Sequence, residues 1–275
     1  MTAMLTLDIA ICTHRPEGIA RVAAMDLPAM EGVRYVVSWQ AHEDAPVPAS
    51  LAGRADVEIH RFDGTGLSRN RNNALEHCRG DVVLIGDDDL LYYPEGIEEV
   101  RRIFAENPDL ELATFRSEHG NMSRFPPEDV TLGKRLPKNY YLTSFELAMR
   151  RSAASELRFC PEFGIGSGRY LCCEEELLLH AAIRRGYVCR YFPVTVCAHP
   201  HESTGTKARL SAGELRAMGA LIALTTGWTA PLRLPLKAWR VSRSGQASFA
   251  KALQSLVSGA FEAPSVRRRN RETLW

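Results

Sequence analysis

Three consecutive aspartates, Asp87, Asp88 and Asp89, directly follow a short apolar run. Adjacent carboxylates repel one another, and such clusters usually persist because a cation or its ligand relieves the repulsion. Mg²⁺ and Mn²⁺ bind carboxylates together with phosphate oxygens, so a diphosphate is the natural co-ligand. The alternative is a solvated acidic turn, but the apolar run before the cluster favours a metal and diphosphate site.

A second polar segment, GLSRNRN at residues 66–72, opens a predicted helix with Ser68 as its N-cap. Free backbone N–H groups and guanidinium groups at a helix start suit a phosphate-rich ligand. The alternative is an ordinary polar surface of arginines and asparagines. The P-loop pattern of nucleotide-binding proteins does not occur in the chain.

Two further groups of residues can carry proton transfer or metal binding. Glu174, Glu175 and Glu176 open a predicted helix that Gly186 ends, and three successive helical residues cannot all face water if the helix is packed on several sides. One of these carboxylates can therefore enter a cleft as a general base. His199 and His201 follow a predicted strand and point opposite ways, so one of them can reach a metal. A plain acidic first turn and a surface histidine pair are the alternatives.

The elements that must position these residues alternate between strands and helices. We predict strands at 5–12, 33–39, 57–62, 81–85, 110–115 and 187–198, with helices at 17–25, 67–78, 94–107 and 174–185. This alternation indicates an α/β fold with a mostly parallel sheet flanked by helices. Ligands of such sheets bind outside the carboxyl ends of the strands. Four polar clusters lie at those ends, and one pocket can collect them: Thr13-His14-Arg15, Gln40, Asp63-Gly64 and Asp87 to Asp89.

This order of motifs resembles the family-2 glycosyltransferases of the GT-A fold over residues 5–205. IAICTHR at residues 9–15 is similar to the family's opening strand and nucleotide loop, and Gly66-Leu67-Ser68-x-x-Arg71-Asn72 is similar to its G-x-S-x-A-R-N stretch. Asp87-x-Asp89 looks like the D-x-D motif, and Cys173-Glu174-Glu175 aligns with the family's G-E-D or G-E-E. HPHES at residues 199–203 resembles the H-x-x-x-S region of polysaccharide-assembling members.

The resemblance implies an inverting glycosyltransferase that uses a nucleotide-diphosphate sugar and a divalent metal, Mn²⁺ or Mg²⁺. It implies a UDP-sugar donor, a glycan or lipid-linked acceptor and a role in surface polysaccharide or glycolipid assembly. Gln40 stands where the family usually has an acid that reads uracil, and its amide can pair with a pyrimidine edge. The implied base is Glu175 or Glu174, and the implied metal ligands are Asp87, Asp89, His199 and His201. The implied donor-binding residues are Thr13, His14, Arg15, Gln40, Asp63, Gly66, Ser68, Arg71, Asn72, Asp87 and Asp88.

Charge is distributed unevenly along a chain of 275 residues with a net charge of +1. Residues 207–275 hold 12 Lys and Arg against three Asp and Glu, a net charge of +9. We therefore expect a catalytic domain over residues 1–206 and a basic helical extension over residues 207–275. Basic, aromatic and aliphatic residues together suit an anionic membrane surface. A helical flap packed on the catalytic domain is the alternative, and no nucleic-acid motif accompanies the charge.

The seven cysteines show no metal-ligand spacing, and we expect reduced thiols. No secretory signal is evident, and no apolar stretch approaches the roughly 20 residues of a membrane span. These features predict a cytoplasmic protein, peripheral on the inner face of the cell membrane. A sugar-nucleotide-forming nucleotidyltransferase and a non-catalytic sugar-nucleotide-binding protein are the competing functions. The usual glycine-rich, arginine-containing loop of the former is missing near the N-terminus.

Overall fold

The computed structural model describes residues 4–118, 120–199 and 209–274. They form two compact units, and each is described by itself. Within the described residues, the first unit comprises residues 4–65, 69–158 and 182–199, and the second comprises 66–68, 159–181 and 209–274. The second unit also includes residues 66–68 and 159–181, which precede residue 206. The predicted domain boundary at residue 206 therefore stays a prediction.

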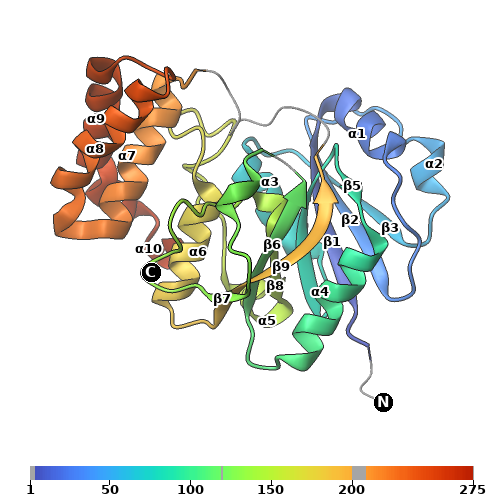
Figure 1. The fold of residues 1–275 in the computed structure, drawn as a ribbon. Coiled ribbons are helices and arrows are strands. Elements are labelled where there is room, and N and C mark those ends of the chain that lie inside the picture. Colours follow the sequence, from blue (N-terminus) through green and yellow to red (C-terminus); the bar gives the residue numbers. More distant parts are fainter. Residues whose placement is uncertain (1–3, 119, 200–208, 275) are drawn as a thin grey trace. The chain divides into compact units, whose positions relative to one another are not determined.

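The first unit is built on a nine-stranded sheet of order β3-β2-β1-β4-β8-β6-β9-β5, with β7 paired to β9. Strands β1, β2, β3 and β4 are parallel to one another, and β6 and β9 run in the same sense. Strands β5, β7 and β8 are antiparallel to their neighbours. The prediction of a mostly parallel sheet flanked by helices is confirmed (Figure 1). The strands are β1 Leu7–His14, β2 Val33–Gln40, β3 Val57–Phe62, β4 Val82–Asp87, β5 Leu91–Tyr92, β6 Leu112–Glu118, β7 Val130–Thr131, β8 Leu147–Arg150 and β9 Cys189–Ala198.

Apolar side chains at alternate positions along the strands form the main core. Leu7, Ile9 and Ile11 of β1 are fully buried in one cluster with apolar residues of α1 and α4. Burying both faces of a central strand explains why β1 and β4 read as nearly continuous apolar runs. The helices are α1 Arg15–Ala24, α2 Ala49–Ala52, α3 Leu67–His77, α4 Pro94–Glu106, α5 Arg151–Glu156, α6 Glu174–Arg184, α7 Ala212–Thr226, α8 Ala230–Arg243, α9 Phe249–Arg269 and α10 Arg271–Leu274.

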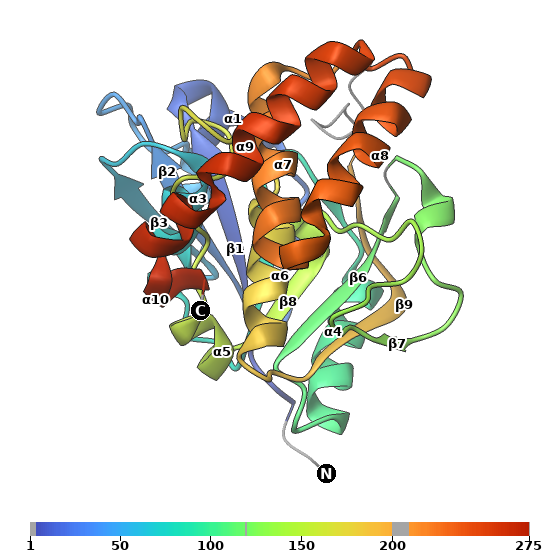
Figure 2. The same cartoon turned by 90° about the vertical axis from the view of Figure 1, so that its left-hand side faces the viewer.

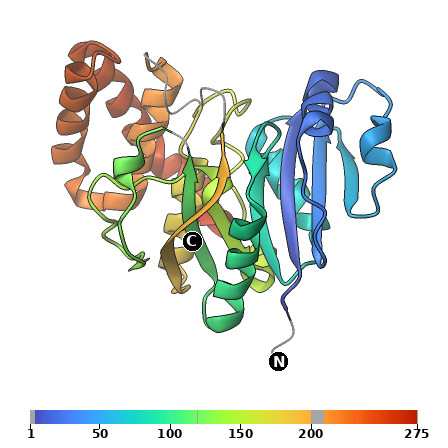
Figure 3. The ribbon, with the colours of Figure 1, turned by 45° about the vertical axis from the view of Figure 1, so that its right-hand side comes forward.

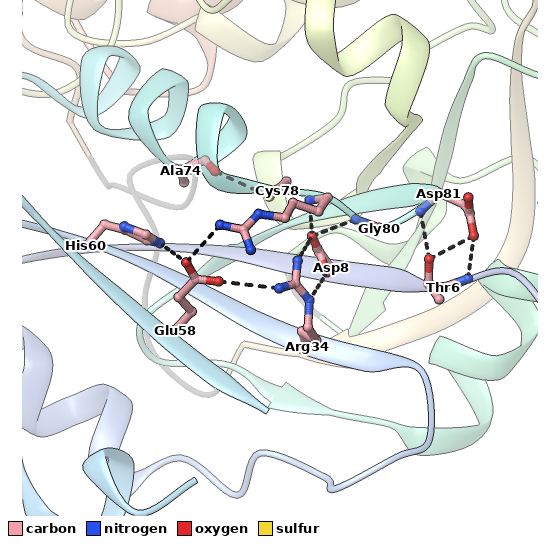
Figure 4. Close-up of polar contacts among 10 residues, drawn as sticks. Thr6, Asp8, Arg34, Glu58, His60, Ala74, Cys78, Gly80 and Asp81 are labelled. Carbon is pink, nitrogen blue, oxygen red and sulfur yellow. Dashed lines mark hydrogen bonds and ion pairs between the residues drawn. The ribbon is translucent and has the colours of Figure 1, made fainter. Parts of the chain in front are cut away.

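The amino-terminal edge of the parallel strands is held by a buried carboxylate. Asp8 accepts hydrogen bonds from the Arg34 guanidinium at 3.0 and 2.7 Å and from the backbone N–H of Gly80 at 2.8 Å (Figure 4). Beside it, Asp81 accepts from both the backbone N–H and the hydroxyl of Thr6, and these bonds lower the pKa of that carboxyl. The network ties the starts of β1, β2 and β4 together and leaves their carboxyl ends for a ligand.

The second unit consists of helices α7, α8 and α9, packed side by side, with a loop and the first turns of α6 (Figure 2). Gly219 and Gly259 permit the close approach of α7 and α9. A Cβ added at Gly219 would lie 1.9 Å from the Leu256 carbonyl oxygen, and one added at Gly259 would lie 1.9 Å from the Arg216 carbonyl oxygen. The predicted helical character of residues 207–275 is confirmed for 212–226, 230–243, 249–269 and 271–274.

Local expectations hold with small shifts at the ends. Gly186 has φ +82°, as expected for a glycine that closes a helix. The prediction that Ser68 caps α3 is wrong, because α3 begins one residue earlier, at Leu67.

The seven cysteines are free thiols, as predicted, and burial raises the pKa of the Cys12 thiol to about 12. No helix in the described ranges has both the length and the apolarity to cross a bilayer.

Candidate active site

The carboxyl ends of β1, β2 and β4 meet at one edge of the first unit. In the sheet register, Cys12 lies beside Asp87 and His14 lies beside Gln40. Figure 3 shows β1 and β2, drawn in blue, running side by side toward this edge. The sequence prediction that the polar ends of these strands come together is therefore correct for these three strands.

A hydrogen-bonded layer of neutral side chains lies under this edge. Asn70 of α3 donates to the Thr13 carbonyl at 3.0 Å, and its amide oxygen accepts from the Ser38 hydroxyl at 2.5 Å. Asn73 donates to the same hydroxyl at 2.7 Å. Because Thr13, Ser38 and Asn70 are buried, these bonds fix the ends of β1 and β2 against α3. Sequence reasoning missed Asn70 and Ser38, since no local signal connects residues 32 positions apart.

The three aspartates have three different environments. Asp88 accepts from the Thr13 hydroxyl at 2.6 Å and from the Arg21 guanidinium at 2.7 and 3.2 Å. This carboxylate links the end of β4 to α1. Its contacts are structural bonds between elements, and they also orient the predicted donor-binding residue Thr13.

Asp87 ends β4 and faces a buried guanidinium. Arg71 donates to Asp87 at 3.3 Å and to the Ser144 hydroxyl at 2.6 Å, and that hydroxyl lies 3.4 Å from the second Asp87 oxygen. The Arg71 side chain is buried, whereas Asp87 is partly exposed. Asp87 therefore balances an internal charge and still presents part of its carboxylate to the edge. Ser144 was not predicted from the sequence.

Asp89 is paired with a histidine from the far end of the sheet. Its Oδ1 lies 3.3 Å from the Nε2 of His199, which directly follows β9. The His199 side chain is largely buried, and Asp89, like Asp87, is partly exposed. Of the two predicted histidines, His199 is thus beside the D-x-D motif, and His201 lies outside the described residues.

The remaining predicted donor residues of the first unit lie at the same edge with varied exposure. His14 and Arg15 are exposed, and Arg15 adopts φ +65°, an uncommon conformation that begins α1 immediately after β1. The Arg15 carbonyl accepts from the Trp39 indole at 2.9 Å. Gln40 is buried at the end of β2, and Asn72 is half-buried in α3.

Asp63 follows β3 and makes a surface contact. One of its carboxylate oxygens lies 3.0 Å from Nε2 of His42, whose ring meets the Trp39 ring edge-on with centroids 5.9 Å apart. The Arg61 guanidinium lies over the same indole, 5.4 Å from its centroid. Aromatic and charged groups therefore gather beside the end of β2, where the sequence predicts the base of the nucleotide.

In the second unit, Gly66 and Ser68 are bound to the glycine-rich loop at residues 163–168. The backbone N–H of Leu67 donates to the Ile165 carbonyl at 2.8 Å, and the Ser68 hydroxyl donates to the Phe163 carbonyl at 2.7 Å. The Leu67 amide is therefore not one of the free N–H groups predicted for a phosphate. Gly66 has φ +104°, and a Cβ there would meet the Gly166 carbonyl oxygen at 3.5 Å.

The candidate bases open α6 in the same unit. Glu174 is buried, and a Cβ added at Gly164 would lie 3.1 Å from its carboxyl group. Glu175 is half-buried. Cys173 precedes them with φ +74°, a conformation that glycine adopts more readily. The chain thus keeps here the backbone shape that the family's usual glycine permits.

Residues 50–162 match the family described as Glycosyl transferase family 2. The match includes residues 66–72 and 87–89, so the resemblance drawn from those motifs is confirmed, and with it the glycosyltransferase class. No curated protein sequence matches the chain.

Solved structures of two proteins share the fold. TarS residues 1–349 from S. aureus superpose with a TM-score of 0.57 at 13% identity, covering 95% of this chain and 92% of that one. The same TarS fragment in complex with UDP-GlcNAc gives 0.58 at 12% identity, with 98% and 88% covered. Glucosyl-3-phosphoglycerate synthase from Mycobacterium tuberculosis, in complex with Mg²⁺ and UDP, gives 0.55 at 17% identity, with 81% and 80% covered. These similarities establish the GT-A-like fold.

Proposed function

We propose that this glycosyltransferase moves a sugar from a nucleoside-diphosphate donor to an acceptor hydroxyl with inversion, and that it requires a divalent metal. The proposal rests on one observation: three adjacent aspartates have different partners. Asp87 and Asp88 are held by Arg71 and Arg21, while Asp89 faces His199 at the sheet edge. A UDP-sugar is the favoured donor, because both solved relatives were crystallised with uridine nucleotides.

The donor atoms at this edge fit a divalent cation. Within the described residues, no group of three His, Cys, Asp or Glu side chains is gathered as a complete metal site. Asp89 and His199 offer one carboxylate and one imidazole, and Asp87 adds a partly exposed carboxylate. Such a small protein ligand set is typical where substrate phosphates and water complete the coordination. The carboxylates suit Mn²⁺ and Mg²⁺. When bound, the cation would offset the negative charge of the departing diphosphate.

The chain's own residues would orient the donor at the end of the sheet. Exposed His14 and Arg15 bring positive charge or hydrogen-bond donors to the diphosphate side. Gln40 offers an amide to the edge of the nucleotide base, and Asp63 lies on the loop after β3. Asp88 acts as a positioning residue, because it holds Thr13 through a hydrogen bond.

The acceptor proton goes to a carboxylate at the start of α6. We assign this role to Glu175, with Glu174 as the alternative. Glu174 is buried beside Gly164, whereas Glu175 is half-buried, so Glu175 is the more accessible of the two to an acceptor. A positioned carboxylate accelerates such a transfer by roughly 10²–10⁴-fold. The acceptor hydroxyl, once deprotonated, displaces the nucleoside diphosphate at the anomeric carbon.

We further propose a glycan or lipid-linked acceptor in surface polysaccharide or glycolipid assembly, and a cytoplasmic enzyme held peripherally at the inner face of the membrane. The support for membrane attachment is the net charge of +9 in residues 207–275. The structural face that would make the attachment is argued below.

The test is donor hydrolysis and transfer by the purified protein with a panel of sugar nucleotides, with and without Mn²⁺. We expect metal-dependent release of a nucleoside diphosphate, and a product with the opposite anomeric configuration by NMR. Release of pyrophosphate would identify a nucleotidyltransferase instead. A protein that binds a sugar nucleotide but neither hydrolyses nor transfers any of the sugars tested would be a non-catalytic binding protein. Asp89→Asn serves as the negative control.

A further inference from the structure

Helix α8 of the second unit has an apolar face that no described residue covers. Four large side chains of this face are exposed, by 87% for Trp228, 75% for Leu232, 47% for Leu236 and 49% for Trp239. Trp228 lies in the short 3-10 turn Gly227–Thr229 that leads directly into α8. We call these four residues the α8 stripe.

The α8 stripe lies opposite the helix's own core contacts. Its members are four, four and three residues apart, a spacing that places them on one side of a helix. The buried residues have the same spacing, displaced by half a turn: Ala230, Leu234, Ala238 and Val241. Of these, Leu234, Ala238 and Val241 pack with residues of α7 and α9 in a small core, so α8 already buries one apolar face in the second unit. The α8 stripe adds nothing to that core.

Positive charge accompanies the α8 stripe. Helix α8 carries four cationic residues, Arg233, Lys237, Arg240 and Arg243, and no acid. No Asp or Glu occurs anywhere between residues 215 and 261. The Arg243 guanidinium lies over the Trp239 ring, 5.3 Å from its centroid, so the two kinds of group are in direct contact.

We propose that the α8 stripe inserts into the headgroup region of an anionic lipid bilayer. Tryptophans favour the membrane–water boundary, and leucines between them gain by leaving water. The neighbouring cations would lie at the level of the lipid phosphates, where each strengthens binding to a negative surface. Since no described helix can span a bilayer, α8 would lie in the plane of the interface.

A second copy of the chain fits this face less well. A two-fold contact would bring the four cations of each α8 close to the four of the other, with no acid on the helix to offset them. A stable protein interface also needs about 800 Å² from each partner, which is more than four side chains on one helix provide. An anionic surface satisfies both the apolar groups and the charges.

This proposal sharpens the membrane attachment in the proposed function, but binding to vesicles can be measured whether or not the sugar transfer is correct. The probes are sedimented vesicles of phosphatidylglycerol and of phosphatidylcholine, with the full-length protein at low and high salt. The test variant is Leu232→Ser combined with Leu236→Ser. The matched control is Met122→Ser, because Met122 of the first unit is 46% exposed, as Leu236 is. Arg233→Gln combined with Arg240→Gln probes the charges.

We expect wild-type protein and Met122→Ser to bind phosphatidylglycerol in a salt-sensitive manner and phosphatidylcholine weakly. The double leucine variant should lose about tenfold or more in partitioning, and the double arginine variant should lose most of the lipid preference. Far-UV circular dichroism checks that the variants remain folded, and Trp228→Ala with Trp239→Ala provides a second stripe variant. Wild-type protein that binds neither lipid, or stripe variants that bind like wild type, would overturn the proposal. A stripe variant that instead turns a dimer into a monomer would assign the face to a second copy.

Discussion

Replacing Asp87, Asp88 and Asp89 by asparagine, one at a time, makes the same chemical change at three adjacent positions. Each substitution removes one negative charge and keeps the shape of the side chain. The structure nevertheless predicts three different outcomes, because the carboxylates face Arg71, Arg21 and His199 respectively. Stability and activity should therefore respond in different proportions.

Asp87→Asn should have the largest effect on stability. The Arg71 side chain is only 3% exposed, and its carboxylate partner Asp87 lies 3.3 Å away and is 27% exposed. Removing one member of a buried ion pair costs about 3–5 kcal/mol. The long contact and the partial exposure of Asp87 reduce this, so we expect a loss of about 2–3 kcal/mol in the free energy of unfolding.

Asp88→Asn should have an intermediate effect on stability. Arg21 is half exposed, so its ion pair with Asp88 contributes about 0–1 kcal/mol. The asparagine oxygen can still accept from the Thr13 hydroxyl. We expect a loss of about 1 kcal/mol in stability and little change in donor KM, because the bond to Thr13 is kept.

Asp89→Asn should have little effect on stability and the largest effect on turnover. The Asp89 carboxylate is partly exposed and lies 3.3 Å from His199, so we expect a stability change within about 1 kcal/mol. A metal ligand supports charge stabilisation of several kcal/mol, so metal-dependent turnover should fall by at least about 10²-fold.

Urea unfolding followed by tryptophan fluorescence measures the stability of the first unit. Trp39 of that unit is fully buried in the folded protein, so its emission changes when the unit unfolds. Nucleoside diphosphate release, measured against Mn²⁺ concentration, gives the activity. Near-wild-type, Mn²⁺-dependent turnover by Asp89→Asn would refute the metal-ligand assignment. A greater loss of stability in Asp89→Asn than in Asp87→Asn would refute the reasoning from burial.

Three further predictions concern the base, a buried ion pair and acid stability. Glu175→Gln should lower kcat by at least about 10²-fold with donor affinity little changed, and the same pattern in Glu174→Gln instead would move the base by one residue. Arg124→Met should destabilise the protein by about 3–5 kcal/mol, because Arg124 and Glu146 form a fully buried ion pair. Adding Glu146→Leu should restore most of the lost stability, since no unpaired charge then stays buried. The urea midpoints of the single and double variants measure both effects. The pKa of Asp81 is lowered by hydrogen bonds from a backbone N–H and a hydroxyl. Its contribution to stability is therefore present above the ordinary carboxyl pKa and is lost as the pH falls through the lower pKa of the folded state. In that acidic range, the wild-type protein should lose more stability than Asp81→Asn, and equal losses would contradict this.

The sequence by itself determined the features that depend on neighbouring residues. Alternating apolar runs and polar ends predicted the parallel strands β1 to β4, and Gly186 predicted the end of α6. The position of the aspartates after a buried apolar run predicted their place at the carboxyl end of β4. These features are local, because strand and helix periods and turn conformations are set within a few residues.

The partners of the aspartates were decided only by the tertiary structure. Arg71 and Ser144 are 73 positions apart, and Asp88 and Arg21 are 67 positions apart. The D-x-D spacing separated Asp87 and Asp89 from Asp88, but no local pattern gave the partner of each carboxylate. Their roles differ because successive residues at a strand end point in different directions and meet different elements.

The antiparallel strand β8 and the two faces of α8 were likewise decided by packing. β8 lies between β4 and β6, which come earlier in the chain, so its place in the sheet depends on contacts between residues that are distant in sequence. In α8, apolar residues occur on both sides of the helix, and the sequence does not say which side is buried. That choice depends on the shape that α7 and α9 present, because burial is a property of the assembled core and not of a single helix.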